Sequence, residues 1–380
     1  KSNAQLIVMK KLTSQARRPS WFGLLILSLT SAGLLSGTAF AQQYQETNLV
    51  SNTSQSGVVT VDPNLINPWG IARSSTGPFW VSDQGKGVST IFDGSGKPAP
   101  PVLVTIPSAG QAASGSPTGI VFNGSSDFAV ESGKPAIFIF ATIDGTIAGW
   151  NPQANPTVAI QKVQATPGSV LTGATIAQSK GQNLLYVADI HEGTIRVFDT
   201  NFSPVKFPAH AFRDDHLSDK FVPFNVQNIG GNLYVAFARQ NPAKNFVTLG
   251  ANLGTVDVFS PEGDLLLRLQ RGTWFNAPWG LVQASTDFGT FSHSILVGQF
   301  GSGEILAFDA VTGQFQGKLE DQNSNTISIP ALWGLAFGAG NASSGAPNEL
   351  FFNAGIDQEK GGLFGFFSPV AADLTQGGDQ

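Results

Sequence analysis

The chain has 380 residues, of which 41% are hydrophobic and only 12% are charged, and it contains no cysteine. Five of its 21 basic residues lie within positions 1–41, where there is no acidic residue, so 16 basic residues face all 26 acidic residues in the rest of the chain. This acidic balance argues against nucleic acid or an anionic membrane surface as a partner. The lack of cysteine excludes disulfides, thiol catalysis and thiolate metal sites.

Residues 1–41 have the pattern of a targeting segment. Four basic residues between positions 10 and 18 precede a mostly apolar run at 24–35, and Ala39-Phe40-Ala41 offers a small-x-small cleavage site. Met9 is the only methionine, so translation is expected to start there, with 1–8 as upstream read-through. The segment predicts a signal peptide cleaved after Ala41 and export to the periplasm or the medium. The apolar run is short for a membrane span.

One short phrase recurs along the rest of the chain, with Gly at its centre and Asn once in place of Gly. The marker residues are Gly70, Gly119, Gly173, Asn225, Gly280 and Gly334, at steps of 49, 54, 52, 55 and 54 residues. In three units the marker is the last residue of a trio with Trp in the middle. These trios are Pro68-Trp69-Gly70, Pro278-Trp279-Gly280 and Leu332-Trp333-Gly334. A fixed period of this length indicates a repeat architecture.

Each phrase is followed by the same succession of predicted strands, each short, rich in Val, Ile, Phe and Thr and bounded by turn residues. The predicted second strands are 79–83, 137–142, 184–189, 233–237, 294–298 and 349–353. The predicted third strands are 88–93, 145–150, 193–198, 254–259, 303–308 and 361–367. Weaker fourth runs follow at 101–106, 158–164 and 265–269. No long run at helical spacing follows the N-terminal segment.

Four strands per unit and six units predict an all-β, six-bladed β-propeller of the NHL-like type. Neither the Gly-His…Trp-Asp pattern of WD40 blades nor the longer kelch period is present. The sixth unit has only three clear strands, at 332–337, 349–353 and 361–367, whereas 44–50 is a strand without a unit. We therefore expect 44–50 to complete the last blade and close the ring. The predicted organisation is a single propeller at 42–370 followed by a polar tail at 371–380. Trp69, Trp279 and Trp333 are interpreted as packing residues, with ligand stacking as the alternative.

Familiar catalytic motifs are absent, since there is no Gly-x-Ser-x-Gly, Walker loop, His-Glu-x-x-His or EF-hand pattern. In a propeller, the turns between second and third strands share one face with the connections between blades, around the channel mouth. Two polar segments are expected there, and they contain three of the four histidines. They are Asp189-Ile190-His191-Glu192-Gly193 and His210-Ala211-Phe212-Arg213-Asp214-Asp215-His216.

Imidazole and carboxylate groups suit a divalent metal or acid–base chemistry, so His191, Glu192 and His216 are candidate ligands of a possible metal ion. The alternative is structural: Asp189 in an Asx turn, and Arg213 paired with Asp214 and Asp215 in a solvated loop. A long insertion at 239–253 is expected to form a lip over the channel mouth, with Arg239 and Lys244 able to meet an anionic group. The candidate ligand-binding residues are thus Asp189, His191, Glu192, Asp214, Asp215, His216, Arg239 and Lys244; no catalytic residue is assigned.

In order along the chain, several short motifs resemble an uncharacterised family of exported bacterial propeller proteins. They are Asn48-Leu49-Val50-Ser51, Asn67-Pro68-Trp69-Gly70, 223–229, Val256-Asp257-Val258-Phe259, Pro278-Trp279-Gly280 and 332–337. The resemblance implies a six-bladed NHL-like fold and export, and it implies no activity. Some members carry a C-terminal Pro-Glu-Pro sorting signal, which residues up to Gln380 lack. The loop after Arg239 is also less charged than in that family.

Three functional hypotheses follow. The first is an exported, non-enzymatic recognition module that binds a small molecule, a glycan or a protein on the loop face at the channel mouth. The second is a metal-assisted lyase or lactonase, by analogy with other six-bladed propellers. The third is a structural envelope or matrix protein that would self-associate.

Overall fold

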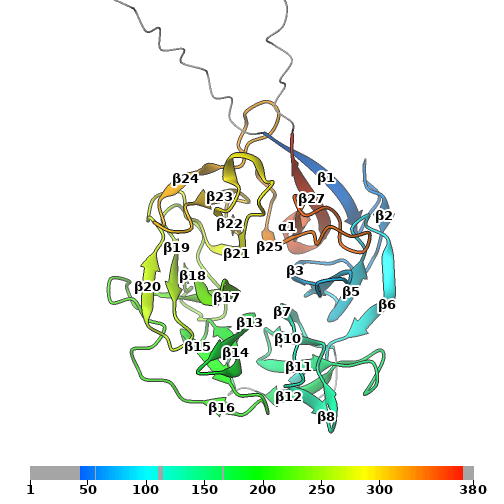
Figure 1. Cartoon of the computed structure of the whole chain (residues 1–380), viewed down its shortest axis with the longest axis vertical. Helices are drawn as coiled ribbons and strands as arrows, with labels where there is room; N and C mark the ends of the chain where they lie inside the picture. The colour runs from blue at the N-terminus through cyan, green and yellow to red at the C-terminus, as the bar shows by residue number, and fades with distance from the viewer. Residues whose placement is uncertain (1–42, 56, 110–113, 165–166, 371–380) are drawn as a thin grey trace, which may run out of the picture. The chain divides into compact units, whose positions relative to one another are not determined.

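The computed structural model describes residues 43–55, 57–109, 114–164 and 167–370. The predicted signal peptide and upstream residues (1–41) and the predicted polar tail (371–380) lie outside the described residues. In the described part, strands form six blades around a channel, as predicted (Figure 1). No helix in that part is long and apolar enough to cross a membrane.

The first three blades are four-stranded antiparallel sheets, with the innermost strand given first. Blade 1 is β3 (Pro68–Ala72), β4 (Phe79–Asp83), β5 (Val88–Phe92) and β6 (Pro98–Thr105). Blade 2 is β7 (Pro117–Phe122), β10 (Phe138–Thr142), β11 (Thr146–Trp150) and β12 (Ile160–Gln164), with a β8 (Ala129–Glu131) and β9 (Lys134–Pro135) hairpin inserted after β7. Blade 3 is β13 (Leu171–Ser179), β14 (Gln182–Asp189), β15 (Thr194–Phe198) and β16 (Pro204–Val205).

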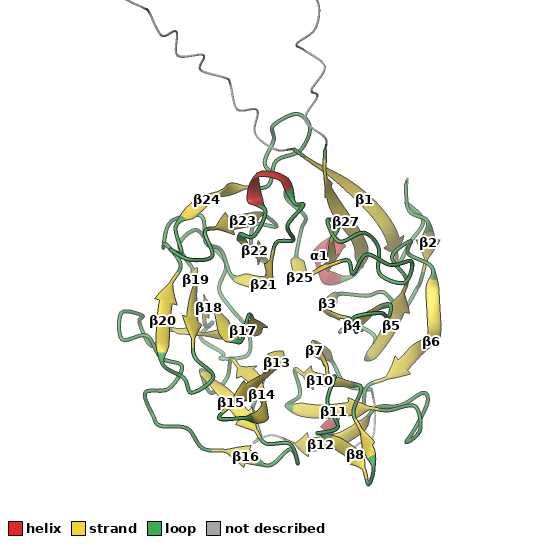
Figure 2. Ribbon diagram, in the orientation of Figure 1, coloured by secondary structure: helices red, strands yellow, loops and turns green. Residues whose placement is uncertain are grey.

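The last three blades follow the same order. Blade 4 is β17 (Phe221–Ile229), β18 (Asn232–Arg239), β19 (Gly254–Phe259) and β20 (Leu265–Arg268). Blade 5 is β21 (Pro278–Gln283), β22 (Ile295–Gln299), β23 (Ile305–Phe308) and β24 (Phe315–Lys318), with a 3₁₀ turn at Gly289–Phe291. Blade 6 is β25 (Leu332–Phe337), β26 (Leu350–Ala354) and β27 (Leu363–Pro369), with the short helical turn α1 (Ile356–Glu359) between the last two. Figure 2 shows how little helix interrupts the strands.

The predicted ring closure is confirmed. β1 (Tyr44–Ser51) lies antiparallel to β27 and completes blade 6, and β2 (Thr60–Val61) adds a parallel edge beyond it. Tyr44 is buried, and its hydroxyl donates to the carbonyl of Phe288 in blade 5 at 2.9 Å. The first strand is thereby fixed to both the last blade and its neighbour. Opening the ring would expose the edges of β27 and its apolar faces.

The recurring Gly marks the place where one innermost strand meets the next backbone to backbone. A Cβ added at Gly119 would lie 2.5 Å from the amide nitrogen of Ala174, and one at Gly280 would lie 2.5 Å from the carbonyl oxygen of Trp333. Real side-chain carbons do not come so close, so Gly is required at these two junctions. In blade 4 the marker is Asn225, and its side-chain amide donates to the carbonyl of Trp279 across the junction at 2.7 Å. The repeat is therefore the sequence signature of the channel wall.

Candidate functional site

Aromatic rings close the channel on the loop face, which carries the turns between second and third strands and the connections between blades. We call this set the aromatic plug: Trp69, Phe224, Phe246, Trp279, Phe300 and Trp333. Trp333 is fully buried and stacks on Trp69 with ring centroids 3.6 Å apart, and on Phe300 at 4.1 Å. Its indole N–H donates to Oδ1 of Asn67 at 3.0 Å. The packing interpretation of the repeated Trp residues is confirmed, since none of the three is accessible to a ligand.

The long insertion in blade 4 lies over the plug as the predicted lip. Gln240 and Val247 form a β-bridge at its base, and Phe246 packs edge-on against Phe224, Phe300 and Trp69. A ligand at the channel mouth itself would have to displace these rings. The predicted ligand site at the channel mouth stays a prediction, and the polar cavity on this face lies beside the mouth, between blades 3 and 4.

This cavity, which we call the interblade pocket, has a volume of ≈ 460 Å³. It is bounded by the β14–β15 turn, the link from blade 3 to blade 4, and the start of the lip. Its lining residues are His191, Glu192, Gly193, Phe212, Arg213, Asp214, Asp215, Leu217, Ser218, Asp219, Phe221, Val222, Phe237, Gln240 and Lys244. Five of the predicted residues thus meet in one place: His191, Glu192, Asp214, Asp215 and Lys244.

Hydrogen bonds across the interblade pocket hold its three walls together. The side-chain amide of Gln240 donates to the carbonyls of Ile190 and His191, and its backbone N–H donates to Lys220 in the link at 2.8 Å. Nδ1 of His191 lies 3.2 Å from the carbonyl oxygen of Lys244. Because these contacts join neighbouring blades, the pocket is preorganised by the fold. Gln240 is one of the residues that the sequence analysis did not single out.

Asp189 and Arg239 do not line the pocket. Asp189 is fully buried; its Oδ1 accepts the backbone N–H groups of His191 and Glu192, and its Oδ2 accepts from Nε of Arg196 at 2.8 Å. It therefore shapes the turn that presents the two pocket residues, as the Asx-turn interpretation expected. Arg239 ends β18 and lies at the base of the lip, where its carbonyl accepts the N–H of Thr248.

The carboxylate of Asp214 is paired with blade 4, and Arg213 is not its partner. Arg268 donates to both carboxylate oxygens at 2.7 and 2.9 Å, and Arg271 donates to Oδ2. Hydrogen bonds from Arg268 hold the pKa of Asp214 well below its ordinary value, although burial opposes them. Neither arginine had been identified as a candidate.

Behind Asp214 lies a second carboxylate, Asp257 on β19, which is fully buried. Its nearest cationic partner is Arg271, whose Nη2 lies 3.8 Å from Oδ2. Burial, and then the negative charge of Asp214, raise the pKa of Asp257 to about 7. The sequence did contain a signal for it, because Asp257 interrupts the buried run Val256–Phe259, where a charged residue is unusual.

The proposed metal ligands do not form one set. His191 and Glu192 line the interblade pocket, but His216 is exposed and is not among the lining residues. The reason is local: Oδ1 of Asp214 accepts the N–H of His216 at 2.9 Å, and this turn carries the chain past the pocket. In the described part of the chain, no three His, Asp or Glu side chains are grouped so that they could hold a metal ion. A divalent cofactor stays a prediction of the sequence alone.

No family model matches the sequence. It is 32% identical over 329 residues to the uncharacterized protein R648 of Acanthamoeba polyphaga mimivirus, an alignment that covers 83% of this chain and 78% of the relative. It is 30% identical over 319 residues to the uncharacterized protein L690 of the same virus, covering 80% of both chains. Both relatives are viral, so they give no support to the bacterial origin or to the Pro-Glu-Pro signal that the sequence resemblance suggested.

Among solved structures, a streptogramin B lyase superposes with a TM-score of 0.51, covering 87% of this chain and 98% of that chain. The two sequences are only 13% identical. This likeness supports the propeller fold.

Proposed function

Since this chain belongs to the family of the uncharacterized mimivirus protein R648, we propose its function from its own geometry: it is a recognition module for a small, hydroxyl-rich ligand such as a sugar. The ligand would occupy the interblade pocket. The observation that carries the proposal is the convergence of His191, Glu192, Asp215 and Lys244, from three separate segments, on one preorganised polar cavity. Its volume lies within the range usual for small-molecule sites.

The pocket chemistry favours hydroxyl groups. No hydrogen bond or ion pair joins the side chains of Glu192, Asp215 or Lys244 to another residue in the described ranges, so these groups are free to bind. They offer both acceptors and cationic donors, and a hydroxyl can serve either because it donates and accepts. Phe212, Phe221 and Phe237 supply apolar surface against which a sugar ring could lie. Export, predicted from residues 1–41, would place such a module outside the cell.

The test is a titration of mono- and oligosaccharides followed by calorimetry, with Glu192→Ala and Lys244→Ala as pocket variants. Each should weaken binding by about tenfold, the size expected for one lost hydrogen bond to a charged group. Glu46→Ala and Lys206→Ala make the same charge changes at exposed positions away from the pocket and should bind normally. If no sugar binds, or if both pocket variants bind as the wild type does, the proposal is wrong.

A second candidate function is a lyase that uses the same pocket. What favours it is that an imidazole and two free carboxylates line one cavity, those of His191, Glu192 and Asp215, which could exchange a proton with a substrate. The fold is also that of a streptogramin B lyase. Incubation with a streptogramin B and mass analysis of the products would test it: turnover should be lost in His191→Ala, and an unchanged substrate would remove this candidate.

A further inference from the structure

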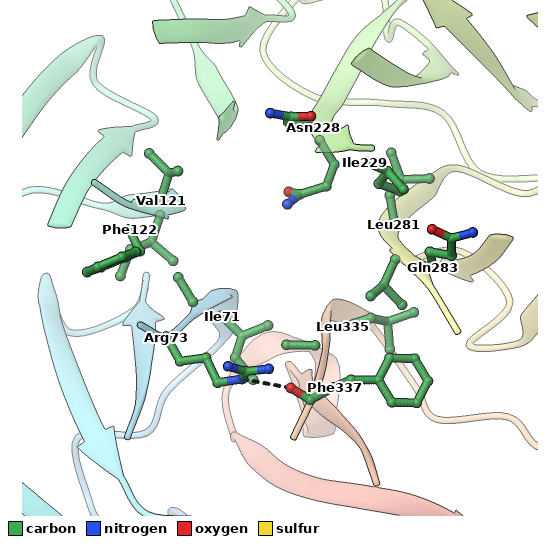
Figure 3. Close-up of a pocket in the computed structure, with 15 residues that line it drawn as sticks. Ile71, Arg73, Val121, Phe122, Asn228, Ile229, Leu281, Gln283, Leu335 and Phe337 are labelled. Carbon is green, nitrogen blue, oxygen red and sulfur yellow. Dashed lines mark hydrogen bonds between the residues drawn. The ribbon is translucent and has the colours of Figure 1, made fainter. Parts of the chain in front are cut away.

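The channel contains a second cavity, at the end opposite the aromatic plug (Figure 3). We call it the channel cup; its volume is ≈ 450 Å³. It is lined by 71–73, 120–122, 227–229, 281–283 and 335–337, near the ends of the innermost strands of blades 1, 2, 4, 5 and 6. No residue from these ranges contributes to the interblade pocket, so the two cavities are independent.

The floor of the cup follows from the repeat. Beneath it the channel narrows to a space of ≈ 20 Å³ between Gly70, Gly119, Gly280 and Gly334, which is room for about one water molecule. Below that level the aromatic plug fills the channel. Within the described residues the cup is therefore a blind cavity, and a ligand would enter it from the face opposite the lip.

Most of the residues that line the cup are apolar, but backbone and amide groups among them make about half of its exposed surface polar. Ile120, Leu281 and Leu335 are buried at its deeper level, whereas Ile71 and Val121 remain partly exposed to solvent. Covering such side chains with an apolar molecule stabilises a complex by about 25 cal/mol for each Å² removed from water. A small hydrocarbon part of a ligand is thus expected to lie against Ile71 and Val121, with polar groups beside it.

Arg73 places a positive charge at the edge of the cup. Its Nε donates to the carbonyl of Phe337 at 2.7 Å (Figure 3). One N–H from each η nitrogen donates to a further carbonyl, Nη1 to Ser74 and Nη2 to Gly338, both at 3.1 Å. A guanidinium has five N–H groups, so two remain. None of the ion pairs within the described ranges involves Arg73. The charge is half-buried without a carboxylate partner, which is a costly arrangement that an anionic ligand would relieve.

Gln227 offers a second polar group on the opposite wall. Blades 1 and 4 face each other across the ring, because the innermost strands contact one another in the order β3, β7, β13, β17, β21, β25. No hydrogen bond joins the Gln227 side chain to another residue of the described chain, and Gln227 lines both the cup and the narrow space beneath it. The neighbouring Asn228 and Gln283 are already bonded, to the carbonyls of Ile176 and His293.

We propose that the channel cup is a binding site for a small apolar carboxylic acid. Its carboxylate would accept the two free N–H groups of Arg73, its hydrocarbon part would cover Ile71 and Val121, and Gln227 would bond any polar group at the far end. The site goes beyond the proposed sugar-binding function and does not depend on it.

Calorimetric titration with octanoate and phenylpropionate, each against its uncharged amide, tests the site. The carboxylates should bind, with a negative heat-capacity change from apolar burial, and about tenfold to hundredfold more tightly than the amides. Arg73→Gln should abolish this preference while leaving amide binding unchanged. Equal binding of acid and amide would overturn the assignment of the charge.

Because Arg73 also joins blades 1 and 6, a second variant leaves that junction intact. Val121→Trp should fill the cup and abolish binding of both acids, whereas Val311→Trp, at a position 84% exposed on the outer surface, should not. The effect on sugar binding provides the comparison with the interblade pocket: Val121→Trp should leave it unaltered. If neither acid binds the wild-type protein, or if binding persists in Val121→Trp, the cup is not the site.

Discussion

At the loop face the central channel is closed by interlocking aromatic rings, whereas at the other end the same strands leave a cavity. Both ends are built by one repeated phrase: Trp69 belongs to the plug, Gly70 to the constriction and Ile71 to the cup. The constriction tolerates almost no variation, because each blade must approach the next. Beyond the constriction, corresponding positions of the repeat carry different residues: Arg73 in blade 1 corresponds to Asn228 in blade 4. Repetition thus marks where the fold is constrained, and departures from it mark where a ligand can be recognised.

The largest loss of stability should come from removing a side chain of the aromatic plug. Trp333→Ala removes a fully buried side chain together with its stacking on Trp69 and its hydrogen bond to Asn67, and should cost about 3–5 kcal/mol of unfolding free energy. Phe122→Ala, in the cup, removes a side chain that is already partly solvated and should cost clearly less. Urea unfolding followed by circular dichroism gives both values. Equal costs would mean that the two ends contribute alike to closure.

The constriction between the two ends is tested by adding one methyl group. In Gly119→Ala the three atoms nearest to the new Cβ would be backbone atoms of Gly173 and Ala174, which move aside less easily than a side chain, so the cost should be about 1–3 kcal/mol. Gly230→Asn is a suitable control, because nothing lies within 4 Å of the new Cβ and Asn tolerates the positive φ of 62°. A control as destabilised as Gly119→Ala would mean that adding a side chain to a glycine costs this much without any contact between blades.

The fold could be predicted from the sequence for a physical reason. The turns and strands of a propeller are formed by residues close together in the sequence, and the contacts between innermost strands are made by Gly at the same position in five of the six units. Both features therefore recur in the sequence at a regular period. Closure of the ring by 44–50 could also be predicted, because the sixth blade lacked a fourth strand and 44–50 was a strand that belonged to no blade. The hairpin 129–135 left no such trace, because it belongs to one blade only.

The site was less predictable because it depends on contacts between distant segments. The sequence identified polar turns, and five of the predicted residues do line one cavity. Spacing along the chain could not show that Arg268 and Arg271 would pair with Asp214, or that His216 would lie outside the cavity. Nothing in the sequence of the lip shows that Phe246 packs into the aromatic plug and helps to fill the channel mouth. The repeated phrase reaches the cup only at the residue after each Gly, such as Ile71, and the polar groups Arg73 and Gln227 are not repeated, so the sequence did not indicate a site there.

The polar side of the loop face should respond to pH. Asp257 binds its proton more tightly in the folded chain, with a pKa of about 7 against an ordinary 3.8. Unfolding free energy should therefore fall as pH rises through this window, because the favourable protonated form is lost. Asp257→Asn cannot ionise, so the fall should flatten, whereas Asp264→Asn at an exposed position should keep the wild-type slope. Urea unfolding at several pH values measures it; an unchanged slope in Asp257→Asn would contradict the assignment.

The smallest expected loss of stability comes from replacing Asn225, the one marker residue that is not Gly, by Gly. Asn225→Gly would give blade 4 the same marker residue as the other blades, yet we expect it to destabilise the protein by about 1 kcal/mol, because the hydrogen bond from Asn225 to the carbonyl of Trp279 is lost. Part of any loss would arise from the added freedom of Gly in the unfolded chain. Asn201→Gly, in an exposed turn, measures that part, since no hydrogen bond joins the Asn201 side chain to another described residue. A larger loss in Asn225→Gly than in Asn201→Gly would show that the exception bridges blades 4 and 5, and equal losses would mean that Gly serves this position as well as it serves the other five.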